Sequence, residues 1–135
     1  VLEKLLIFGN DYNTLDGTGV RDYIHVVDLS KGHVCALKFL ERFSGYEAFN
    51  LGTGNGYSVL QVIKSVEQCT GKSINYEVTS RREGDVGACF ADPSLAKEKL
   101  GWVAKKSLKE MVSDALNWQS KNPTGYPYMP TGNSK

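Results

Sequence analysis

The sequence has few of the residues that build metal sites or disulfide frameworks. It contains three cysteines and two histidines among 135 residues. The cysteines are odd in number and not closely paired, and neither histidine stands at ligand spacing from any of them. We therefore predict no metal site and free thiols at Cys35, Cys69 and Cys89. His25 and His33 are interpreted as packing or surface residues without a chemical role.

The sequence also lacks an excess of charge of one sign and any long apolar run. Sixteen Lys and Arg against fifteen Asp and Glu leave a formal charge of +1, so no basic field exists to hold nucleic acid or an anionic membrane surface. No run is long enough to span a bilayer, and no charged-then-apolar signal segment is present. We predict no nucleic-acid partner, no membrane partner and a cytoplasmic location.

The hydrophobic content of 41% is sufficient for the core of one globular domain. The chain opens inside an apolar run, "VLEKLLIFG", without an initiator methionine. We expect such an opening in a piece of a larger protein.

Strand and helix patterns alternate along the chain, which predicts the α/β class. Helices are expected after Asp28, after capping boxes at Ser58 with Gln61 and at Ser107 with Glu110, and in a short segment with Asp92 as cap, Pro93 at the first position and Gly101 past the end. Gly71 is expected to end the second helix. Strands are expected over 4–8, 22–26, 48–51 and 74–79, the last half-buried.

Three glycines follow the expected strand 48–51, in "NLGTGNGYS". A dinucleotide-binding turn needs G-x-G-x-x-G, because the third glycine lets the helix pack on the strand. Here the third position is Tyr57, and Gly56 comes one residue too early. We predict a strand-to-helix turn without a cofactor, in which Gly54 or Gly56 serves backbone geometry.

Two charged strings could carry chemistry. "SRREGD", Ser80 to Asp85, offers adjacent arginines and a carboxylate at a strand end, and "GTGVRDYIHV" supplies Arg21 beside Tyr23. Planar arginine forks suit phosphate oxygens, although a solvated surface turn is the commoner use of such a string.

These strings, with "FNLGTGNGYSVLQV" and "LGW" in the same order and spacing, resemble the C-terminal part of the UDP-glucose 4-epimerases, also called UDP-galactose 4-epimerases. The resemblance runs over residues 1–126, and 127–135 is expected to be a flexible tail. It implies the C-terminal, substrate-binding part of an extended short-chain dehydrogenase of Rossmann type. Residues 48–70 would be one edge strand and helix of the cofactor domain.

The resemblance implies an NAD-dependent isomerase of homodimeric form. Such an enzyme interconverts UDP-galactose and UDP-glucose through a 4-keto intermediate. The site residues implied for the UDP-hexose are Leu6 and Phe8 around uracil, Arg21 and Arg82 on the diphosphate, Asp85 on the ribose, Tyr23 and Val59 lining the pocket, and Cys89 at the sugar. Arg81 is interpreted as a structural or rim residue.

The family's glycine-rich NAD turn, its Tyr-x-x-x-Lys pair and its catalytic serine or threonine have no match in these residues. We therefore expect no catalytic or cofactor-binding residue here, NAD to be bound by a missing N-terminal part, and the isolated chain to be inactive.

Cys89 stands where some family members have a tyrosine, and the smaller side chain would leave room for an N-acetyl group. A thiol that merely packs explains it equally well. Two alternatives to the epimerase also stay open: another extended short-chain UDP-sugar enzyme, such as a decarboxylase or dehydratase, and a non-catalytic UDP-binding module.

Overall fold

The structure is a computed structural model that describes residues 3–126; the tail predicted over 127–135 lies outside the described residues. Four helices and five short strands follow one another along the described chain. They are β1 Leu5–Phe8, β2 Val20–Arg21, α1 Val26–Leu40, β3 Tyr57–Ser58, α2 Val59–Thr70, β4 Tyr76–Thr79, β5 Ala88–Cys89, α3 Ser94–Leu100 and α4 Leu108–Lys121. The α/β prediction is confirmed.

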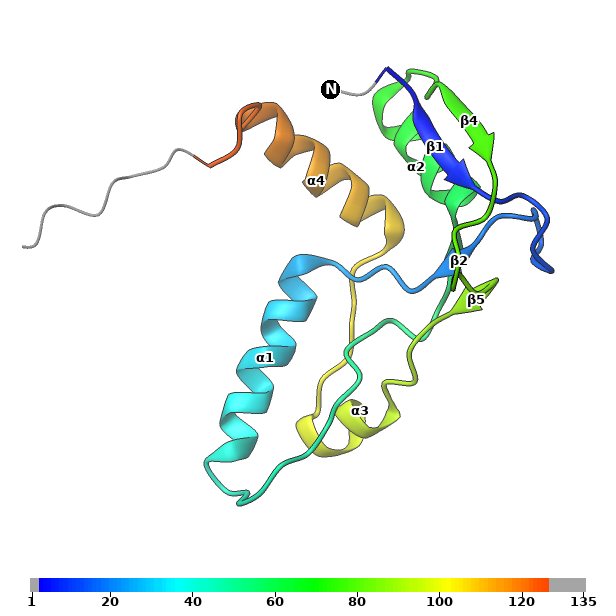
Figure 1. Cartoon of the computed structure of the whole chain (residues 1–135). Coiled ribbons are helices and arrows are strands. Elements are labelled where there is room, and N and C mark those ends of the chain that lie inside the picture. Colours follow the sequence, from blue (N-terminus) through cyan, green and yellow to red (C-terminus); the bar gives the residue numbers. More distant parts are fainter. Residues whose placement is uncertain (1–2, 127–135) are drawn as a thin grey trace, which may run out of the picture.

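The strands form two small sheets. β1 pairs in parallel with β4, from Leu5 opposite Tyr76 to Phe8 opposite Thr79. β2 is the middle strand of the second sheet, antiparallel to β3 and parallel to β5. Figure 1 shows α2 beside the β1–β4 pair, whereas α1 and α3 lie together at the opposite end of the molecule.

The predicted helix ends are largely confirmed. Ser58 and Gln61 form a capping box at α2, and Gly71 ends that helix in the left-handed conformation, with φ of 67°. A second capping box joins Ser107 and Glu110 at α4. Hydrogen bonds from the Ser107 backbone and hydroxyl, with the nearby Lys106 ammonium, lower the pKa of the Glu110 carboxyl to about 2.

Other predicted boundaries are wrong. The strand predicted over 22–26 is absent, because β2 ends at Arg21, residues 22–25 connect the two elements and α1 begins at Val26, before Asp28. α3 begins at Ser94, although the Asp92 carboxylate does accept from its backbone N–H at 3.0 Å.

Residues 48–51 form no strand among the described residues. A strand needs a neighbour for its backbone hydrogen bonds, and no described strand pairs with this segment. Its assignment to the edge of a cofactor-domain sheet stays a prediction. β4 is mostly exposed instead of half-buried, with Tyr76 and Val78 on its surface.

The buried core is small. Its apolar members come from β1, the loop after β1, α2, α3, α4 and the segment after α3: Ile7, Tyr12, Ile63, Ala96, Val112 and Trp102. The Trp102 indole N–H donates to the Asp28 carbonyl at 2.9 Å, and the Asp28 carboxylate accepts from the Lys105 and Lys106 backbone N–H groups. These bonds fasten the segment between α3 and α4 to the first turn of α1.

Candidate functional site

Arg21 has a backbone position fixed by the central strand of the second sheet. It lies opposite Tyr57 of β3 on one side and opposite Cys89 of β5 on the other. The Val20 N–H donates to the Gly87 carbonyl at 2.8 Å, which fastens β2 to the loop entering β5. The Arg21 side chain is one-third exposed, and its Nη1 donates to the Val20 carbonyl.

Asp85 lies between the two arginines that the sequence singled out. Its Oδ2 accepts from Arg82 Nε at 2.9 Å, and its Oδ1 lies 3.6 Å from Arg21 Nη2. Arg82 is the most open of the three, with 62% of its side chain exposed. The structure therefore brings Arg21, Arg82 and Asp85 together as one charged cluster.

Phe8 extends this cluster to the end of the first sheet. The Arg82 guanidinium carbon lies 4.6 Å from the centroid of the Phe8 ring, at cation–π distance. This contact follows from the parallel pairing, because β1 ends at Phe8 and β4 ends beside it at Thr79, shortly before Arg82. Polar and aromatic side chains that follow the carboxyl ends of parallel strands meet at one edge.

Arg81 points to different partners. Its Nε donates to Asp11 Oδ1 at 2.7 Å and its Nη2 donates to the Asp11 carbonyl at 2.6 Å, while its guanidinium covers the ring of buried Tyr12 at 4.2 Å. The hydrogen bond to Asp11 raises the pKa of Arg81. Arg81 thus fastens the loop after β1 and leaves Arg82 as the open arginine.

The remaining predicted residues lie around this cluster or away from it. Leu6 is 44% exposed on β1, opposite Glu77. Val59 is the first residue of α2, and its N–H donates to the Gly19 carbonyl at 3.2 Å, two residues before Arg21. Cys89 is exposed in β5 of this chain, and its place at the sugar stays a prediction.

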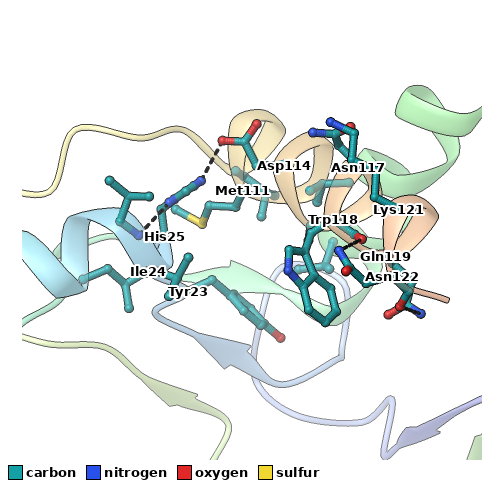
Figure 2. A pocket seen from close by; sticks show the side chains of 16 residues that line it. Tyr23, Ile24, His25, Met111, Asp114, Asn117, Trp118, Gln119, Lys121 and Asn122 are labelled. Atoms are coloured by element: carbon teal, nitrogen blue, oxygen red, sulfur yellow. Dashed lines mark hydrogen bonds and ion pairs between the residues drawn. The ribbon is translucent and has the colours of Figure 1, made fainter. Parts of the chain in front are cut away.

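Tyr23 is the predicted residue that faces another part of the molecule. It lines a cavity of about 930 Å³ between the β2–α1 connection and α4. Figure 2 shows Tyr23 and Trp118 near one end of this cavity and His25, Met111 and Asp114 near the other. His25 is buried, accepts from the Val27 N–H through Nδ1 at 3.0 Å, and pairs with Asp114 through Nε2 at 2.9 Å.

Asp22 is a structural centre that our sequence interpretation missed. Its carboxylate accepts from the Thr53 N–H and hydroxyl, the Gly54 N–H and the Ala91 N–H, all within 3.2 Å. Burial raises the pKa of this carboxyl, but the hydrogen bonds outweigh burial and the pKa is lowered overall. Two features of the sequence could have indicated this role for Asp22. It directly follows Arg21, and the backbone N–H groups of the glycine turn need a hydrogen-bond acceptor.

The glycine turn is shaped around this carboxylate. A Cβ on Gly52 would lie 2.4 Å from Asp22 Oδ2, and Gly54 has a φ of 74°. The prediction that Gly54 serves backbone geometry is confirmed. The N–H groups of Thr53 and Gly54, which a dinucleotide turn would offer to a pyrophosphate, already donate to Asp22, so this turn does not fit NAD.

Cys35, Cys69 and Cys89 are free thiols, as predicted. Within residues 3–126, no three His, Cys, Asp or Glu side chains are grouped to hold a metal ion. In the same range, no helix has the length and apolar character needed to cross a membrane.

The chain is similar to several known proteins. The GDP-mannose 4,6 dehydratase family matches residues 1–115 of the chain. The chain belongs to this family. Among its relatives, the UDP-glucose 4-epimerase of Homo sapiens is 58% identical over 124 residues, covering 92% of this chain and 36% of that protein. The UDP-glucose 4-epimerase of Bacillus subtilis is 57% identical over 125 residues, covering 93% and 37%.

The fold of the chain is also similar to that of a solved UDP-glucose 4-epimerase. The UDP-glucose 4-epimerase from Bifidobacterium longum, in complex with NAD+ and UDP, matches with a TM-score of 0.85 and 50% identity, covering 93% of this chain and 37% of that one. The predicted resemblance to the UDP-glucose 4-epimerases and the partial Rossmann-type fold of an extended short-chain dehydrogenase are confirmed. The chain spans little more than a third of the length of these relatives.

Proposed function

We propose that this chain is the UDP-hexose-binding portion of an NAD-dependent UDP-glucose 4-epimerase, an isomerase that inverts the C4 hydroxyl of UDP-galactose or UDP-glucose. The observation that carries the proposal is the convergence of Arg21, Arg82 and Asp85 at the sheet ends. The similarity to relatives of that name supports the reaction class. The B. longum structure, with its UDP, supports the ligand class.

The chemistry of the cluster suits a nucleoside diphosphate. Arg21 and Arg82 present guanidinium donors that can bind phosphate oxygens with charge-assisted hydrogen bonds. Asp85 can accept hydrogen bonds from ribose hydroxyls. The aromatic ring of Phe8 beside Arg82, and Leu6 on the same strand, would contact the uracil. Val59 is proposed to line the outer part of the same pocket. Tyr23 lines the separate cavity beside α4, so its proposed place at the nucleotide is the outermost of the set.

NAD would supply hydride transfer at the sugar C4 in the complete enzyme. The described glycine turn does not fit its pyrophosphate, since Asp22 occupies the backbone donors. We therefore propose that NAD is held by the part of the enzyme outside this chain, and that this chain alone does not epimerise. Its own task is to hold the UDP moiety while the hexose changes its orientation.

Cys89 is proposed to bound the hexose pocket. The strand register places it opposite Arg21, and the residue is exposed. A small side chain at this position leaves volume for an acetamido group, so we propose that UDP-N-acetylgalactosamine and UDP-N-acetylglucosamine are also accepted.

The complete enzyme is proposed to be a cytoplasmic homodimer without nucleic-acid or membrane partners. The balanced charge of +1 supports the last part of this proposal, because it offers no extended basic field.

A dehydratase is the second candidate, because the matching family takes its description from a GDP-mannose 4,6 dehydratase. Calorimetric titration of the chain with UDP and with GDP separates the two. The epimerase proposal expects UDP to bind more tightly. Tighter binding of GDP would favour the dehydratase, and binding of neither nucleotide would contradict the proposed UDP site.

Addition of NAD and UDP-galactose to the purified chain tests its proposed inactivity. We expect no UDP-glucose. Product formation by the chain alone would contradict the assignment of the chemistry to another part of the enzyme.

A further inference from the structure

The charged cluster contains its own anion. Asp85 contacts both arginines that would bind the diphosphate, at 2.9 Å from Arg82 Nε and 3.6 Å from Arg21 Nη2. Its side chain is 24% exposed, which is less than either arginine. A phosphate oxygen that approaches these guanidinium groups must therefore compete with a carboxylate already in place.

We propose that Asp85 is a specificity-determining residue that makes the arginine pair reject inorganic phosphates and accept nucleoside diphosphates. This inference rests on the proposed nucleotide site. A bare pyrophosphate has to displace Asp85 from the arginines, and it lacks the ribose hydroxyls that a nucleoside diphosphate could donate to the displaced carboxylate. The displaced carboxylate stays beside the bound anion without a partner of its own, and the repulsion between the two anions weakens binding.

A nucleoside diphosphate brings its own compensation. Its ribose hydroxyls are hydrogen-bond donors, and a carboxylate released from the arginines can accept from them. The exchange replaces an ion pair with charge-assisted hydrogen bonds and leaves the arginines to the diphosphate. Asp85 thus links recognition of the ribose to recognition of the phosphates. A ligand that binds well must satisfy both the Asp85 carboxylate and the two arginines.

The cluster is open enough for this exchange. The Arg82 side chain is 62% exposed, and exposed ion pairs are held by only small free energies. Arg82 also contacts the Phe8 ring, with its guanidinium carbon 4.6 Å from the ring centroid. Arg81 offers the contrasting case, because Asp11 pairs with it outside the cluster.

The test is calorimetric titration of the full chain with inorganic pyrophosphate and with UDP, comparing wild type with Asp85→Asn. We expect the substitution to raise pyrophosphate affinity about three- to tenfold, the scale of two partly exposed ion pairs. UDP should gain less than pyrophosphate or lose affinity, because the acceptor for its ribose is weakened. The ratio of UDP to pyrophosphate affinity should therefore fall.

Asp11→Asn is the matched control. It removes an arginine-paired carboxylate and changes the net charge by the same amount, but Asp11 pairs with Arg81. We expect less than a twofold change for either ligand. Asp85→Ser, with thermal unfolding of each variant, provides a second test if Asp85→Asn does not fold.

The outcomes separate this inference from the proposed function. If pyrophosphate affinity does not rise beyond that of Asp11→Asn, or if UDP gains as much as pyrophosphate, Asp85 does not select the ligand. If wild type fails to bind UDP while Asp85→Asn still gains pyrophosphate, the counter-anion role stands and the nucleotide proposal fails. Adding Arg21→Gln to Asp85→Asn should abolish the gain, and persistence of the gain would also overturn the inference.

Discussion

His25 Nε2 lies 2.9 Å from Asp114 Oδ2 and joins the start of α1 to the middle of α4. The other ring nitrogen accepts from the Val27 N–H, so a single imidazole both caps α1 and connects two helices. This arrangement holds one wall of the cavity in Figure 2.

We expect His25→Ala to lower the free energy of unfolding by about 1 to 2 kcal/mol, because a helix cap and a cross-helix hydrogen bond are lost together. Urea denaturation followed by circular dichroism measures the change. His33→Ala is the control, since exposed His33 bonds only to the Leu29 carbonyl within α1. Equal effects of the two substitutions would show that the pair with Asp114 contributes nothing.

Asp22→Asn should destabilise the chain by about 1.5 to 3 kcal/mol at neutral pH, since it turns amide hydrogens toward backbone donors that need an acceptor. The pKa of Asp22 is lowered in the folded state, so its contribution is present above the ordinary value of 3.8 and is lost as the pH falls through the folded pKa. Denaturation at pH 7 and at successively lower pH should show the difference between wild type and variant shrinking below about 3.8. A difference that grows on acidification would contradict the assignment.

Arg82→Ala should weaken UDP binding by roughly 1.5 to 3 kcal/mol, the scale of a charge-assisted hydrogen bond. Arg81→Ala, in which the neighbouring guanidinium is removed from Asp11 and Tyr12, should weaken it much less. Calorimetry on the two variants gives the ranking directly. The reverse ranking would mean that the roles of these arginines have been exchanged.

Cys89→Tyr should discriminate between sugars. A phenol ring in the space of an acetamido group costs about 1 to 3 kcal/mol through overpacking, so binding of UDP-N-acetylgalactosamine should fall at least about fivefold. Binding of UDP-galactose should stay nearly unchanged. Equal losses for both ligands would indicate general damage, and no change for either would show that Cys89 lies outside the hexose pocket.

Apolar side chains on α1 should promote self-association of the isolated chain. Val34, Leu37 and Leu40 are at least half exposed, and such a face tends to bind another apolar surface. Leu37→Lys should reduce both apolar-dye fluorescence and the oligomeric fraction in sedimentation velocity. Leu15→Lys, at a residue that is 98% exposed in the loop after β1, is the control. A monomeric wild type that binds no dye would contradict this prediction.

Local signals predicted the parts of the fold that depend on neighbouring residues. The capping boxes at Ser58 and Ser107 lie within one helical turn, so the sequence contains the whole interaction. Strand pairing depends on distant partners. This dependence explains the error over 22–26 and the absence of a strand at 48–51 in the described residues. Residues 22–26 suit a strand by composition, but the last two of them cap and begin α1.

In the candidate site, too, some residues could be predicted from the sequence and others depend on distant parts of the chain. The resemblance to the family identified Arg21, Arg82 and Asp85 as site residues, because a motif can be matched without knowledge of the fold. The structure places these three residues together. Asp22 was missed because its donors come from Thr53, Gly54 and Ala91, far along the chain. Tyr23 faces α4 because the chain turns after Arg21 to enter α1, which residue spacing alone does not reveal.

The parallel pairing of β1 with β4 has a consequence for the order of folding. Leu5 and Tyr76 meet across about 70 residues of chain that include α1 and α2, so closing this pair carries a large entropic cost and comes late. Phe8 and Arg82 meet only after that closure. A ligand held between the ends of these strands would therefore bind only the state in which β1 and β4 are paired. Its binding would slow amide hydrogen exchange in β1 and β4 more than in the locally stabilised α2 and α4.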